Sequence, residues 1–153
     1  MESLEKFLVE HDFLAGMNKE YIDLMVGCSS NVRFKEGEYI CREGREANMF
    51  YILREGKVSL DIHMPQRGPV AIMTLDAGQV LGWSWLFPPH RWQFDALAKT
   101  DIRAIAFDGE CMRKKCEENH DLGYEIMKRF SQVLAERLQS TRLQLMDVYC
   151  AKG

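Results

Sequence analysis

The stretch FKEGEYICREGREANMFYILREGKVSL, residues 34–60, decides the fold. It places glycines at positions 37, 44 and 56 between short runs that are rich in apolar residues. Apolar residues that recur with a period of two are typical of β-strands, and glycine tolerates the positive φ that many tight turns require. This stretch therefore predicts short strands joined by turns.

The same pattern extends over residues 32–107, where further glycines stand at positions 68, 78 and 82. We expect hairpin turns at residues 54–57 and 65–68, because both contain glycine between strand-like runs. Several short strands at a spacing of roughly 8 to 12 residues indicate a sandwich, roll or barrel. The clearest predicted strands are Met49 to Leu53, Val58 to Ile62, Val70 to Leu75 and Ile102 to Phe107.

Helical periodicity flanks the strands on both sides. Residues 3–26 predict two short helices, with apolar positions such as Leu4, Phe7 and Leu8 and a break at Ala15-Gly16. After Gly109 we expect a short helix over residues 110–118 and a long one from Asp121, its predicted N-cap, to about Tyr149.

Together these elements predict an α+β fold, an antiparallel β-roll of the double-stranded jelly-roll type with N-terminal helices and a long C-terminal helix. A length of 153 residues is typical of one domain. We expect residues 1–153 to form that domain, with helices in 1–30, the roll in 31–108 and helices in 109–153.

The long helix carries two apolar stripes. Ile126, Phe130 and Val133 form a stripe that we expect to pack on the roll, and a second stripe recurs at steps of four and three residues. Two stripes need two surfaces, so the second predicts a homodimer seam; a fully intramolecular helix is the alternative. The predicted seam consists of Leu134, Leu138, Thr141, Leu145 and Val148.

Composition excludes several classes of function. The chain has 20 Lys and Arg against 23 Asp and Glu, so it lacks the positive field that nucleic-acid binding requires. It shows no long apolar segment and starts with an acidic stretch, so we expect a cytoplasmic protein without membrane association. Scattered histidines predict neither a metal site nor an enzyme. The five cysteines show no C-x-x-C spacing, and we expect free thiols.

Residues 34–60 resemble the opening strands of the cyclic-nucleotide-binding domains of the catabolite activator and Fnr regulator families. The resemblance extends through AKTDIRAIAFDGE, residues 98–110, to AERLQSTRLQL, residues 135–145. In those regulators a helix-turn-helix domain follows the long helix, whereas this sequence stops at Gly153. We therefore expect a sensor domain without a DNA-reading part.

The family's phosphate-binding cassette corresponds to GWSWLFPPHRWQFDALA, residues 82–98. The resemblance implies that a Glu after the first Gly binds the ribose, and that an Arg ten residues after that Gly binds the phosphate. Here Gly82 opens the segment, Trp83 stands at the Glu position, Trp92 at the Arg position and Gln93 at the position of a small residue. Both charged anchors are absent.

The remaining candidate residues lie around these positions. Ser84 and Trp85 continue the opening of the cassette, and Arg91 precedes the Arg position by one residue. Thr141 resembles the family Thr that touches the adenine. Without the anchors, affinity for cyclic AMP or cyclic GMP should fall at least about a hundredfold.

These features predict a non-catalytic regulatory module that acts through a protein partner, with the aromatic rings filling the vacated pocket. One alternative is a small-ligand sensor in which the rings line a pocket and Arg91 or Gln93 orients the ligand, or in which weak cyclic-nucleotide binding persists. Another is a haem or redox sensor of the same fold. We expect no resident cofactor.

Overall fold

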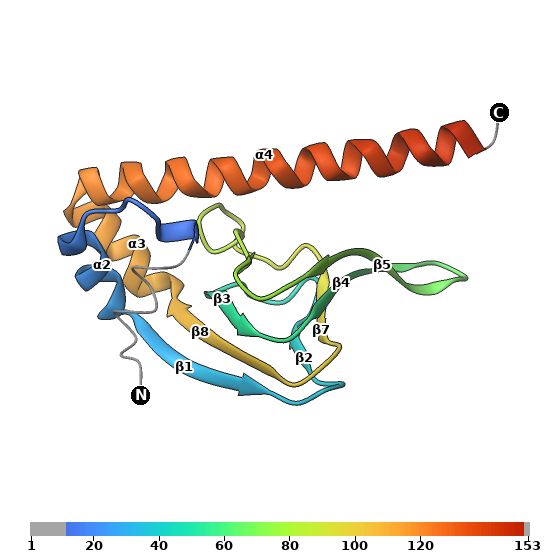
Figure 1. Ribbon diagram of the computed structural model, residues 1–153, viewed down its shortest axis with the longest axis horizontal. Helices are drawn as coiled ribbons and strands as arrows, with labels where there is room; N and C mark the ends of the chain where they lie inside the picture. Colours follow the sequence, from blue (N-terminus) through green and yellow to red (C-terminus); the bar gives the residue numbers. More distant parts are fainter. Residues whose placement is uncertain (1–11, 152–153) are drawn as a thin grey trace.

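The computed structural model describes residues 12–151, and Figure 1 shows their arrangement. The predicted helix around Leu4, Phe7 and Leu8 lies outside the described residues. The elements are η1 (Asp12–Leu14), α2 (Lys19–Val26), β1 (Ser29–Phe34), β2 (Tyr39–Cys41), β3 (Met49–Glu55), β4 (Val58–Met64), β5 (Gly68–Leu75), β6 (Val80–Leu81), β7 (Asp95–Ala98), β8 (Ile102–Asp108), α3 (Gly109–Glu118) and α4 (His120–Ala151).

Two four-stranded antiparallel sheets form the roll. One has the strand order β1-β8-β3-β6 and the other β2-β7-β4-β5, so consecutive strands lie in opposite sheets, as in a jelly roll, except in the β4–β5 hairpin. The predicted α+β fold and the four predicted strands are confirmed, with each strand one or two residues longer than expected.

The two predicted hairpin turns differ in outcome. Residues 65–68 join β4 to β5, which pair in register from Met64 opposite Gly68, and this hairpin is confirmed. The prediction for residues 54–57 was wrong, because β3 pairs with β6 and β8 whereas β4 pairs with β5 and β7. Gly56 has a φ of 99°, and a Cβ there would lie 2.5 Å from the backbone oxygen of Asp101. The glycine thus marks a tight crossing between sheets, which local sequence does not distinguish from a hairpin.

Helix α4 runs along one side of the whole roll (Figure 1). Its 32 residues give it a length of about 48 Å. Ile126 and Phe130 are buried and Val133 packs against the same core, which confirms the predicted roll-facing stripe.

A single residue separates the two C-terminal helices. The Asn119 side chain accepts a hydrogen bond from the backbone N–H of Leu122 at 3.1 Å, and α4 starts at His120. Asn119, and not the predicted Asp121, is therefore the N-cap. The same residue is the C-cap of α3, because its backbone N–H donates to the carbonyl of Lys115 at 2.9 Å.

The apolar residues form two clusters. The helical cluster lies between the helices and one sheet and includes Phe50, Trp85 and Phe130. The roll cluster lies between the two sheets and includes Trp92 and Phe94. Trp83 packs against both clusters, so the predicted cassette lies at the boundary between roll and helices.

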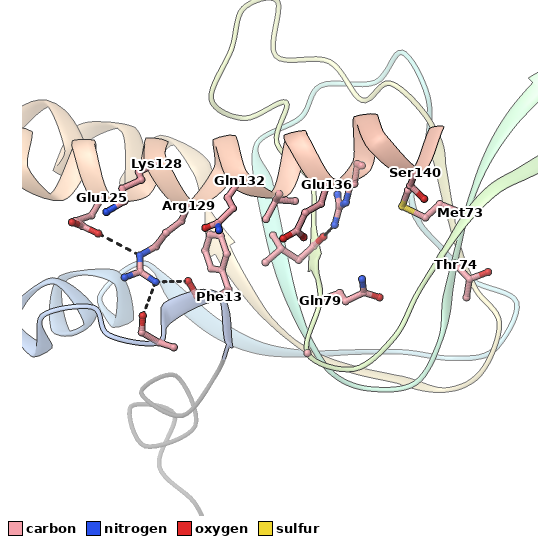
Figure 2. A pocket seen from close by; sticks show the side chains of 15 residues that line it. Phe13, Met73, Thr74, Gln79, Glu125, Lys128, Arg129, Gln132, Glu136 and Ser140 are labelled. Carbon is pink, nitrogen blue, oxygen red and sulfur yellow. Dashed lines mark hydrogen bonds and ion pairs between the residues drawn. The ribbon is translucent and has the colours of Figure 1, made fainter. Parts of the chain in front are cut away.

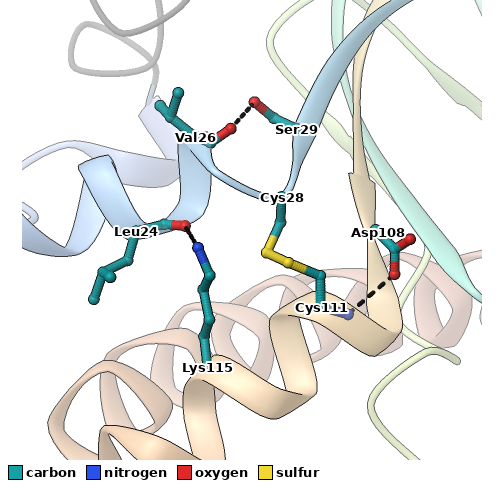
Figure 3. The surroundings of a disulfide bond; sticks show 7 residues. All are labelled: Leu24, Val26, Cys28, Ser29, Asp108, Cys111 and Lys115. Carbon is teal, nitrogen blue, oxygen red and sulfur yellow. Dashed lines mark hydrogen bonds between the residues drawn. A yellow bond between two sulfur atoms is a disulfide. The ribbon is translucent and has the colours of Figure 1, made fainter.

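A disulfide joins Cys28 to Cys111, with 5.7 Å between the two Cα atoms (Figure 3). The expectation of free thiols was therefore wrong for these two residues. They lie 83 residues apart in sequence, and only the fold brings them together. Cys41, Cys116 and Cys150 are free thiols.

Candidate functional site

Residues 82–94 form the cassette segment, which links β6 to β7. Gly82 opens it with a φ of 102°, and turns follow, with hydrogen bonds from Leu86 N–H to the Trp83 carbonyl at 3.0 Å and from His90 N–H to the Phe87 carbonyl at 2.9 Å. None of these described residues is α-helical. The segment therefore offers a phosphate no helix N-terminus with free backbone N–H groups.

Trp92, at the position of the family Arg, points into the roll and is only 6% exposed. Its ring reaches to 2.8 Å from the point that a Cβ on Gly82 would occupy. The backbone is fixed on both sides, because Gly44 N–H donates to the Trp92 carbonyl and Trp92 N–H donates to the Arg45 carbonyl. The indole is thus held firmly against the start of its own cassette.

Three rings meet at this point, and we call them the ring cluster: Trp83, Trp92 and Phe94. The Phe94 centroid lies 5.5 Å from that of Trp83 and 6.0 Å from that of Trp92, both at steep angles. Edge-to-face packing of this kind adds to the stabilisation from apolar burial. The structure therefore brings the two residues that replace the charged anchors together through a third ring.

Ser84 and Trp85, which follow Trp83, are both buried. Trp85 joins the helical cluster, where its ring stacks on Phe50 at 4.9 Å and meets Phe130 edge-on at 5.4 Å. Arg113 of α3 donates to the Trp85 carbonyl at 2.6 Å. Trp85 therefore connects the cassette to α3 and α4.

The polar candidates lie at the surface. Arg91 donates to the Gly44 carbonyl at 3.1 Å, and Gln93 donates to the Arg91 carbonyl at 3.0 Å. Thr141 is exposed on α4, and its hydroxyl donates to the Arg137 carbonyl one turn earlier at 2.9 Å. The hydrogen bonds of these three side chains all go to nearby backbone carbonyls.

Arg137 is a candidate that the sequence reasoning missed. Its guanidinium lies 5.4 Å from the centroid of the Trp83 ring, and its Nη2 donates to the Val80 carbonyl just before the cassette. Burial lowers the pKa of Arg137 to about 10, although Glu136 partly opposes this change. Arg137 lies one helical turn before Thr141 on the predicted long helix, and this position is the signal that could have identified it.

A pocket of about 770 Å³ lies between α4 and the β5–β6 connection (Figure 2). Its lining includes Gln79, Lys128, Arg129, Glu136 and Arg137, and none of the predicted cassette residues. Arg129 donates to the Phe13 carbonyl at 2.7 Å and pairs with Glu125 at 3.5 Å, as the dashed lines in Figure 2 show.

A smaller pocket of about 460 Å³ lies on the outer side of the roll. Its lining residues are Arg42, Glu43, Arg45, His63 and Asp95.

Two properties of residues 12–151 bear on other classes of function. Among these residues, no group of three or more His, Cys, Asp or Glu side chains has the arrangement of a metal site. No helix within the same range combines the length and the apolar character that crossing a bilayer requires.

The family model of the cyclic nucleotide-binding domain matches residues 31–119, which span β1 to the end of α3. The chain belongs to the cyclic nucleotide-binding domain family. Human cGMP-dependent protein kinase 2 is 26% identical over 111 residues, which are 71% of this chain and 15% of the kinase. The chain thus spans about 15% of the length of the curated relatives it matches.

Solved cyclic nucleotide-binding domains share the architecture. One from Methylobacillus flagellatus superposes with a TM-score of 0.80 at 12% identity, over 94% of this chain and 81% of the other. The regulatory subunit of a cAMP-independent protein kinase A from Trypanosoma brucei superposes with a TM-score of 0.68 at 24% identity, over 83% of this chain and 45% of the other. The chain has the fold of a cyclic nucleotide-binding regulatory domain.

Proposed function

We propose that residues 1–153 form one regulatory domain in which the ring cluster seals the nucleotide site, and which acts as a homodimer on a protein partner. The burial of Trp92 against Gly82, at the position of the family Arg, carries the proposal. We place the protein in the cytoplasm and assign it neither catalytic activity nor nucleic-acid binding.

The charges around the cassette support a closed site. A cyclic phosphate requires a cation in the pocket, and one charge-assisted hydrogen bond is worth about 1.5 to 3 kcal/mol. Arg91 is exposed and donates to the Gly44 carbonyl, while Arg137 donates to the Val80 carbonyl and lies over Trp83. Neither guanidinium occupies the space that the Trp92 ring fills. The Trypanosoma brucei relative is described as cAMP-independent, which is consistent with a fold that serves regulation without that ligand.

Isothermal titration calorimetry tests the sealed site. Wild-type protein should give no heat of binding with cyclic AMP or cyclic GMP below about 1 mM ligand. A dissociation constant of that size corresponds to a binding free energy of only about 4 kcal/mol. The double variant Trp83→Glu with Trp92→Arg should gain measurable binding. The matched control Phe87→Glu with Gln93→Arg places the same charges on exposed positions of the segment and should remain silent. Micromolar binding by the wild type would overturn the proposal.

The exposed stripe of α4 supports the dimer. Leu138, Leu145 and Val148 are 71%, 56% and 53% exposed, and a lone chain would leave them in water. Leu134 and Thr141 continue the same stripe at the spacing of a coiled-coil seam. A second copy offers a matching stripe, because a two-fold axis brings the same residues together.

A second candidate function is a small-molecule sensor that uses the groove between α4 and the β5–β6 connection. The favouring observation is the pocket of about 770 Å³ in which Arg137 joins the helix to the residues that precede the cassette. A polar ligand there would contact α4 and the roll at once. Native mass spectrometry of freshly purified protein tests this, because a retained molecule that Arg137→Met releases would favour the groove and a ligand-free spectrum would disfavour it.

A further inference from the structure

The disulfide joins the segment that leads into the roll to the helix that leads into α4. Cys28 lies between α2 and β1, and Cys111 lies in the first turn of α3 (Figure 3). Cys28 is buried and Cys111 is half-buried, so one end of the bond lies near the surface.

Helices α3 and α4 are coupled closely enough to move as one body. Asn119 ends α3 and caps α4, as described above. The helices also approach so closely that a Cβ on Gly123 would lie 3.1 Å from the backbone oxygen of Cys116. A bond to Cys111 therefore also restrains α4, which carries the exposed stripe.

Weaker contacts remain across this junction when the disulfide is removed. Lys115 of α3 donates to the Leu24 carbonyl at 2.6 Å, and Arg129 of α4 donates to the Phe13 and Ala15 carbonyls at 2.7 and 3.0 Å. The strands of the roll pair independently of the bond. The disulfide thus adds a covalent tie to a junction that is also held by these hydrogen bonds, by a bond from the Asp108 N–H to the Cys28 carbonyl at 2.9 Å, and by the buried side chains of the helical cluster.

We propose that the Cys28–Cys111 disulfide is a reversible thiol switch that sets how tightly the α3–α4 unit is held to the α2–β1 junction. The inference rests on the proposed cytoplasmic location, because disulfides in that compartment are usually transient and redox-sensing. It supplies a trigger for a regulatory domain whose nucleotide site is sealed.

The chemistry is ordinary thiol–disulfide exchange with a dithiol reductant. One thiolate of the reductant attacks a sulfur of the disulfide, which breaks the S–S bond and forms a mixed disulfide, and the released cysteine takes a proton. The second thiolate of the reductant then attacks the mixed disulfide, so that Cys28 and Cys111 both end as thiols and the reductant becomes a cyclic disulfide. Two electrons pass from the dithiol to the protein.

Two measurements on the full chain test the switch, with dithiothreitol as the reductant. Differential alkylation and mass spectrometry should find Cys28 and Cys111 blocked before reduction and labelled after it. Hydrogen–deuterium exchange should then rise at least about tenfold more in residues 19–26 and 109–118 than in the β3 and β8 strands, whose exchange follows the loss of global stability.

Variants separate the switch from a purely structural bond. Cys111→Ala should show the exchange of the reduced protein with or without dithiothreitol, while the matched control Cys116→Ala on the same helix should behave as wild type. The switch is overturned if air-oxidised protein lacks the disulfide, or if reduction raises exchange in the two helices by no more than it raises exchange in β3 and β8. None of these outcomes bears on cyclic-nucleotide binding or on dimerisation, so the proposed function stands or falls separately.

Discussion

Removing the disulfide should lower stability by an amount that follows from its position in the sequence. The bond closes a loop of 83 residues. In the chain-entropy description, closing a loop of that size removes conformational entropy from the unfolded chain and so raises its free energy by about 4.5 kcal/mol at 25 °C. The double variant Cys28→Ala with Cys111→Ala should lose about that much relative to the oxidised wild type. A domain of ordinary stability, about 5 to 15 kcal/mol, would remain folded.

Urea unfolding followed by tryptophan fluorescence measures the difference. With a slope of about 2 kcal/mol per molar urea, the midpoint should fall by roughly 2 M, and the melting temperature should fall by about 9 to 18 °C. Dithiothreitol should move the wild type to the midpoint of the double variant and leave the variant unchanged. A difference below about 1 kcal/mol would refute the reasoning, because it would mean that the bond is absent in solution or that the unfolded chain is already restricted.

Three further predictions concern single side chains. Phe130 packs edge-on against Phe13, Phe50 and Trp85. Phe130→Ala should therefore lower the free energy of unfolding in urea by about 3 to 5 kcal/mol, whereas Leu143→Ala, at an exposed position, should lower it by less than about 0.5 kcal/mol. Equal losses in the two variants would contradict the packing. Leu138→Glu should convert a dimer to a monomer in sedimentation velocity, whereas the neighbouring Gln139→Glu should not, and a monomeric wild type at micromolar concentration would rule out the seam. Burial raises the pKa of the Cys41 thiol to about 12, so the folded state keeps a proton that the unfolded chain loses near pH 9. The unfolding free energy should therefore fall by up to about 1.4 kcal/mol between pH 9 and pH 10. If Cys41→Ala shows the same fall over this pH range, other groups cause it.

Much of the roll could be predicted from the sequence because its signals are local. The alternation in Val58 to Ile62 and the glycines between the strands depend on neighbours a few residues apart. The roll-facing stripe of α4 has the same character, since helical spacing alone brings Ile126 and Phe130 to one face. The Gly82 segment, which links β6 to β7, was proposed from a family motif that is likewise continuous in sequence.

The features that escaped prediction depend on distant parts of the chain. Cys28 meets Cys111 only when β1 and α3 have both packed on the core, and no spacing rule applies to an 83-residue separation. Arg137 contacts Val80 and Trp83 through the position of α4 along the roll, which the heptad pattern does not define. The crossing at Gly56 resembles a hairpin because a glycine of positive φ serves both geometries.

The ring cluster belongs to the hydrophobic core, with Trp92 and Phe94 in the roll cluster and Trp83 packed against it. A charged anchor at position 92 would replace an indole that fills the space between the two sheets. Such a step would sacrifice several kcal/mol of folding free energy before any ligand compensates for it. Any ligand affinity gained from a charged anchor at this position would therefore come with a loss of folding stability.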